Sequence, residues 1–224
     1  MYDVALSLGT DCQTRYNISK YIYLKNGGAS SEFLLTEKRK NVSDYGSFFF
    51  DWCVSTLEGV CRVLEGDFSN VLLLENLFIE ETSHGTQHVV DKYTGFQYPH
   101  SFPGSQDNKL TYDILTEHYP LFLEKTAYII NKTRSVLNSS KRKLLICRSN
   151  DSCEVVENFL NLICSNYSNF HLVYINSSKE DSFLSLLDKY HCVDLYQMTR
   201  QKYPGCYEDW ENILSNYELT LPNL

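Results

Sequence analysis

Apolar and polar segments alternate regularly in the last third of the chain. Short, mostly apolar runs predict buried strands at 143–150, 170–176 and 193–198. Segments with helically spaced apolar residues follow them at 152–167, 178–190 and 207–217. Strands that alternate with helices of this length are typical of βαβ units, so these strands are expected to run parallel.

The N-terminal segment also contains a predicted strand followed by a predicted helix. Residues 3–8 (DVALSL) form a short apolar run that ends at Gly9, and residues 12–24 predict a helix. We expect this strand to join the same sheet. The pattern therefore predicts an α/β fold, a three-layer sandwich with a mostly parallel central sheet and helices on both faces.

The first part of the middle region is predicted to contain a strand and a helix. Residues 47–52 (SFFFDW) are interpreted as a buried strand or strand end. The next segment predicts a helix that is capped by Ser55 or Thr56 and stops at Gly66.

Turn residues and one long helix complete the middle of the chain. Residues 70–108 are irregular and rich in Gly, Pro, Ser and Asn, whereas 109–137 is the strongest helix pattern. Pro120 is expected to kink this helix or to mark its start. The whole chain, 1–224, is interpreted as one α/β domain with an irregular insert around 70–108 and a βαβ-rich part at 141–217.

Charge and hydropathy exclude several classes of protein. The formal net charge of −8 argues against general nucleic-acid binding, which requires a basic face. The longest apolar runs are too short to span a bilayer. The N-terminus lacks the basic and apolar regions of a secretory signal, so we expect a cytoplasmic protein.

The eight cysteines are scattered and contain no Cys-x-x-Cys pair. A structural zinc site needs closely paired ligands, so no metal site is expected. Free thiols in a reducing compartment fit this pattern best. Cys61, Cys147 and Cys164 lie in apolar segments and are interpreted as core residues.

Cys12 differs from the others because it lies between the first predicted strand and the helix after it. Functional side chains of parallel α/β sheets lie at the carboxyl ends of strands. A helix N-terminus favours a thiolate, and its amides can stabilise an oxyanion. Gly9 permits a tight turn, and Asp11 is a natural cap whose charge would raise the thiol pKa unless it points away. Cys12 is therefore either a nucleophile or a structural thiol.

A thiol nucleophile needs a base, and His100 is the best candidate among the six histidines. It lies in an aromatic loop between Pro99 and Pro103, where neighbouring rings can shield the imidazole. A loop histidine with no role would have the same appearance. His118 and His171 are interpreted as surface or structural residues.

Three polar residues at strand ends could complete a site. Asp51 lies within an aromatic run, so it either orients a histidine in a pocket, caps the next helix or pairs with an arginine such as Arg148. Arg148 and Asn150 follow a buried strand and either bind an anion or only terminate the strand.

Four blocks resemble, in order and approximate spacing, a largely uncharacterised bacterial family of papain-like cysteine peptidases, often classed as a domain of unknown function. They are SLGTDCQ (7–13), FFFDWCVSTLEGVCRVLEGDF (48–68), FQYPHSF (96–102) and LLICRSND (144–151). By position, the resemblance assigns family residues to Ser7, Leu8, Gly9, Cys12, Phe50, Asp51, Trp52, His100, Phe102 and Arg148. Ser101 stands where the family usually has an acidic residue.

The resemblance implies a cysteine enzyme that transfers an acyl group, with Cys12 as nucleophile, His100 as base and Asp51 as the residue that orients it. Gly9, Gln13, Trp52, Arg148 and Asn150 are the expected substrate-binding residues. With water as acceptor it is a hydrolase or peptidase acting on a small-molecule, glycan or peptide substrate without a cofactor.

Two alternatives stay open. LGTDCQ is also similar to a Gly-Asn-Cys-Gln turn in polysaccharide-modifying enzymes that use coenzyme A, which would make the protein an acyltransferase for surface polysaccharide. The other is a non-catalytic module that binds an anionic or nucleotide-sugar ligand at Arg148.

Overall fold

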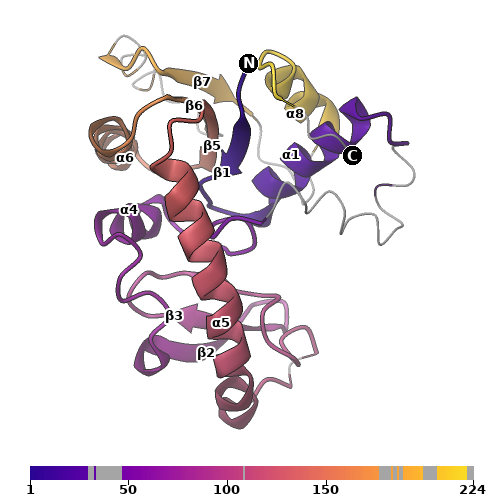
Figure 1. Ribbon diagram of the computed structural model, residues 1–224. Helices are drawn as coiled ribbons and strands as arrows, with labels where there is room; N and C mark the ends of the chain where they lie inside the picture. Colours follow the sequence, from indigo (N-terminus) through magenta and orange to yellow (C-terminus); the bar gives the residue numbers. More distant parts are fainter. Residues whose placement is uncertain are drawn as a thin grey trace.

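The computed structural model describes residues 1–29, 33, 47–107, 109–176, 183, 186, 189–198 and 206–220. A four-stranded parallel sheet forms the upper part in Figure 1, in the order β1 (Val4–Ser7), β5 (Lys143–Ser149), β6 (Phe170–Asn176) and β7 (Val193–Gln197). These are the four strands predicted from the apolar runs. The predicted helix at 178–190 lies largely outside the described residues.

Helices cover both faces of this sheet (Figure 1). On one face, α1 (Cys12–Lys25) and α8 (Tyr207–Leu214) pack on Leu144 and Ile146 of β5. On the other face, α4 (Leu57–Glu65) and α6 (Cys153–Asn166) pack on Leu145 and Cys147. Successive β5 side chains thus enter different cores, as the pleat of a strand requires. The predicted three-layer α/β sandwich is confirmed.

Helix α4 begins and ends where the sequence predicts. The Thr56 hydroxyl accepts a hydrogen bond from the Gly59 amide at 3.1 Å, and Gly66 is the C-cap. In contrast, the prediction of a strand at 47–52 is wrong, because the backbone turns there. The Asp51 carboxylate accepts a hydrogen bond from the Phe48 amide at 2.6 Å, which closes the turn and lets three successive phenylalanines, Phe48, Phe49 and Phe50, enter the core.

The segment predicted to be irregular contains a small antiparallel sheet. The short helix η2 (Leu74–Asn76) leads into β2 (Leu77–Glu81), β3 (Gln87–Asp91) and β4 (Gln97–Tyr98), which pair in that order. These strands are short and three of the five β2 residues are exposed, so they lack a continuous apolar signal.

The long helix α5 (Tyr112–Leu137) runs from the antiparallel sheet to the parallel one (Figure 1). Thr111 caps it, and Pro120 lies inside it rather than at its start. Of the three cysteines predicted in the core, Cys147 is buried, whereas Cys61 and Cys164 are half-buried and pack against the core's edge. None of the helices in the described ranges is both long and apolar enough to cross a bilayer.

One hydrogen bond joins α5 to the turn at 48–53. The buried Thr133 hydroxyl accepts from the Phe49 amide at 2.9 Å and donates to the Ile129 carbonyl at 2.8 Å. We predict that Thr133→Val lowers the free energy of unfolding by about 1–3 kcal/mol, because a buried amide loses its acceptor.

Thr116→Val is the matched control for this experiment. The Thr116 hydroxyl also donates to the carbonyl four residues earlier on α5, but it is exposed and no described amide donates to it. Urea unfolding of both variants measures the difference, and equal losses of stability would contradict the role given to Thr133.

Candidate active site

The turn between β1 and α1 is held by contacts with two distant segments. The Thr10 carbonyl accepts from the Ser55 amide at 2.8 Å, and the Thr10 hydroxyl donates to the Arg148 carbonyl at 2.5 Å. Gly9 has φ of +90°, and a Cβ there would lie 2.7 Å from the Ser55 hydroxyl oxygen. The turn therefore needs glycine at position 9 for both conformation and space.

Asp11 and Arg148 form the polar centre of this turn. One Asp11 oxygen accepts from the Gln13 amide at 2.9 Å, as an N-cap does, and the other lies 2.8 Å from Nη1 of Arg148. The same Nη1 also donates to the Gln13 side-chain oxygen. Arg148 is only 6% exposed, and its charge compensates that of the partly exposed Asp11.

Cys12 is the first residue of α1 and is half-buried. It lies just beyond the carboxyl end of β1, where the sequence places it, so its thiol experiences the positive end of the α1 dipole. An ionised Cys12 would raise the pKa of the Cys53 thiol, which burial and the Asp51 carboxylate raise more strongly. Cys12 and Cys53 are therefore electrostatic neighbours.

Asp51 and Arg15 form a buried ion pair one helical turn beyond Cys12. Nε of Arg15 lies 3.4 Å from Oδ2 of Asp51, and their exposures are 1% and 0%. Burial raises the pKa of Asp51 from 3.8 to about 6, and the Arg15 charge and the Phe48 amide oppose this shift only in part. The described partners of this carboxylate are Arg15 and Phe48 rather than His100.

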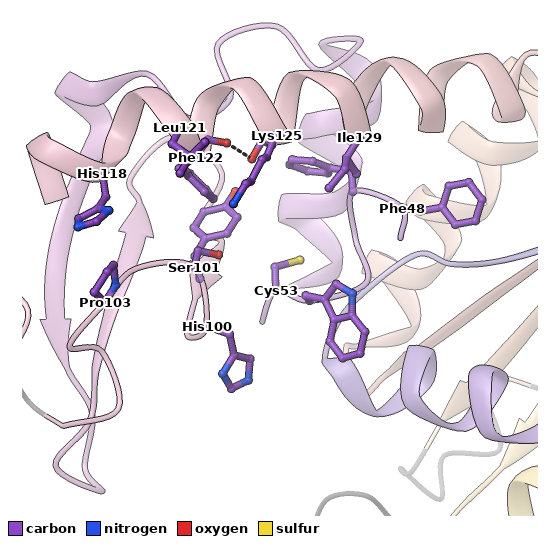
Figure 2. A pocket seen from close by; sticks show the side chains of 14 residues that line it. Phe48, Cys53, His100, Ser101, Pro103, His118, Leu121, Phe122, Lys125 and Ile129 are labelled. Carbon is purple, nitrogen blue, oxygen red and sulfur yellow. Dashed lines mark hydrogen bonds between the residues drawn. The ribbon is translucent and has the colours of Figure 1, made fainter. Parts of the chain in front are cut away.

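A cavity of about 410 Å³ opens beneath α5 (Figure 2). The residues that line it are Phe48, Phe49, Trp52, Cys53, Tyr98, His100, Ser101, Pro103, His118, Leu121, Phe122, Lys125, Thr126 and Ile129. The buried ones belong to its inner wall, and the exposed ones, which include Trp52 and His100, form its rim. Partial burial lowers the pKa of His100, and nearby His88 lowers it further.

The predicted site residues thus fall into three groups. Gly9, Cys12, Gln13 and Arg148 share the turn, with Asn150 exposed beyond the end of β5. Trp52 and His100 belong to the cavity, while Asp51 lies in the buried pair. Cys53 connects these groups, because it lines the cavity and has both Asp51 and Cys12 as electrostatic neighbours.

Sequence reasoning missed several residues of this region. Arg15 was one, and the sequence offered no signal for it, because Gln13, Thr14, Arg15, Tyr16 and Asn17 form a mostly polar run that only the structure shows to be buried. His118 was expected at the surface or in a structural role, but it lines the cavity. Tyr98 and Lys125 gave no signal beyond their residue types.

No described part of the chain gathers three or more His, Cys, Asp or Glu side chains as a metal site would. Comparison of the chain with family models, curated proteins and solved structures finds no match. The candidate chemistry therefore depends on the geometry above.

The Asp51 pair predicts a pH dependence of stability. Because the native state holds the Asp51 proton more tightly than the unfolded chain, the stability from this group is greatest below pH 4 and declines as pH rises through 6, by up to about 3 kcal/mol. Asp51→Asn removes the titration. Urea unfolding at several pH values should show the wild type losing stability relative to Asp51→Asn between pH 4 and 7, and a constant difference would contradict the raised pKa.

Proposed function

We propose that this protein is an enzyme that transfers acyl groups through the Cys12 thiolate. The observation that carries the proposal is the position of Cys12 at the N-terminus of α1, at the carboxyl edge of a parallel sheet. Parallel α/β sheets commonly place their reactive groups at this edge. The Asp11 charge, which would otherwise disfavour a thiolate, is paired with Arg148.

The chemistry follows the general scheme of covalent catalysis. His100 takes the proton of the Cys12 thiol, the thiolate sulfur bonds to the acyl carbon, the bond to the leaving group breaks, and the leaving group takes that proton from His100. Water or another hydroxyl then gives its proton to His100 and attacks the thioester, and the bond from the acyl carbon to sulfur breaks. The sulfur takes the proton back from His100, which restores the thiol and the neutral imidazole and releases the acyl product. Amides at the N-terminus of α1 are the proposed oxyanion donors.

His100 suits the role of base because its pKa is lowered, which leaves the imidazole neutral and able to accept a proton near pH 7. Asp51 is proposed as a positioning residue. It acts through Arg15, which lies three residues beyond Cys12 on α1, and not by direct contact with the imidazole. The resemblance to papain-like cysteine peptidases supports the same set of residues.

A hydrolase is favoured over a module that binds an anion at Arg148. Nη1 of Arg148 is already engaged by Asp11 and Gln13, and the side chain is almost fully buried. The geometry of Arg148 suits a residue that stabilises the turn between β1 and α1. The coenzyme A-dependent acyltransferase remains the second candidate, and saturable binding of coenzyme A, measured by calorimetry, would favour it.

A nucleophilic Cys12 should react faster with an alkylating reagent than a buried thiol does. At pH 7, iodoacetamide should alkylate Cys12 about tenfold or more faster than Cys61, whose pKa burial raises to about 12. Peptide mass spectrometry resolves each cysteine. Cys153 is an informative comparison, because it is also half-buried and the first residue of a helix that follows a parallel strand.

Hydrolysis of 4-nitrophenyl octanoate tests the chemistry itself. Cys12→Ser should lower the rate by about a thousandfold or more, and His100→Gln by about a hundredfold or more, because nucleophile and base are lost. Cys153→Ser should keep the wild-type rate. Full activity in Cys12→Ser, or loss of activity in Cys153→Ser alone, would overturn the proposal.

A further inference from the structure

The cavity beneath α5 combines an apolar body with charge of a single sign. Phe48, Phe49, Phe122 and Ile129 form much of its wall, and Trp52 stands at its rim, 40% exposed. No Asp or Glu lines it, although the chain as a whole carries a net charge of −8. The ionisable groups that can carry positive charge there are His100, His118 and Lys125. This distribution favours a ligand with an apolar body and a negative charge.

Tyr98 supplies a second, independent observation. Its side chain is 5% exposed and lines the cavity, yet its hydroxyl has no hydrogen-bond partner among the described residues. Burial raises its pKa, so the hydroxyl keeps its proton at neutral pH and is available as a donor. A buried hydroxyl without an acceptor costs free energy, and a ligand oxygen would recover it.

Lys125 is placed to face the same ligand. Figure 2 shows its side chain descending from α5 toward the loop that carries Ser101 and His100. The Tyr98 ring packs edge-on against Phe122, three residues before Lys125 on α5, with ring centroids 5.5 Å apart. The Tyr98 hydroxyl and the Lys125 ammonium therefore belong to one wall of the cavity.

We propose that the cavity binds an alkyl or aryl carboxylate, with a carboxylate oxygen on the Tyr98 hydroxyl, the Lys125 ammonium balancing its charge and the apolar body along the aromatic wall. About 410 Å³ is near the lower end of small-molecule sites, so the body is short. As the substrate class of the enzyme, this proposal rests on the proposed function: the carboxylate would be the acyl product. The binding itself does not require Cys12.

Calorimetric titration of the Cys12→Ser protein with octanoate, 2-naphthoate and octanol tests the binding. We expect both carboxylates, or one of them, to bind saturably, and octanol to bind about tenfold or more weakly. The difference between octanoate and 2-naphthoate identifies an alkyl or an aryl body. Octanol binding as tightly as octanoate, or no saturable binding by any of the three probes, would overturn the proposal.

Variants locate the ligand and separate binding from folding. Tyr98→Phe should weaken carboxylate binding about tenfold or more and leave octanol binding unchanged, without lowering the urea midpoint, because it removes an unpartnered hydroxyl. Lys125→Gln should weaken carboxylate binding about threefold, and less at high salt. Lys92→Gln, an exposed lysine that does not line the cavity, is the control. Unchanged carboxylate affinity in Tyr98→Phe would contradict the proposed contact.

The two proposals fail in different ways. Carboxylate binding that depends on Tyr98, together with ester hydrolysis that survives Cys12→Ser, would leave the cavity as a binding site and remove the catalytic role of Cys12. Hydrolysis that requires Cys12, in a protein that binds none of the three probes, would keep the enzyme and overturn this assignment of its substrate.

Discussion

The buried ion pair between Asp51 and Arg15 is the constraint on which the candidate site depends. Charges of both signs are costly to bury, so the pair is tolerated only because each partner and the Phe48 amide offset part of that cost. The same carboxylate closes the turn at 48–53. Through the Phe49 amide, that turn is joined to Thr133 and hence to α5.

This arrangement connects two parts of the molecule that serve different purposes. Arg15 belongs to α1, whose first residue is Cys12, and the turn closed by Asp51 supplies Phe48, Phe49, Trp52 and Cys53 to the cavity. A displacement of the pair would therefore alter both the start of α1 and one wall of the cavity. Positioning residues of this kind support a site without touching what binds there.

Arg148 has a similar role at the other side of the turn. It joins the end of β5 to the N-cap of α1 across 137 residues of sequence. Since its charge faces Asp11, the carboxylate next to Cys12 is compensated where it would otherwise oppose a thiolate. The position of Arg148 at a strand end would suggest that it binds an anion. In this structure it supports the proposed nucleophile instead.

The sequence by itself determined the parallel sheet, its covering helices and the place of Cys12 at a strand-to-helix turn. Those features depend on local periodicity and caps, such as the apolar run of β5 and the Thr56 cap of α4, which single segments carry. It was misleading at 47–52, where consecutive phenylalanines resemble a strand but a side-chain hydrogen bond turns the backbone. Only the tertiary structure decided the partners of Asp51 and Arg148 and the cavity that contains His100, Tyr98 and Lys125. Such contacts join residues that are far apart in the sequence. Which partner a charged side chain pairs with depends on burial and on the neighbouring charges, and both exist only in the folded chain.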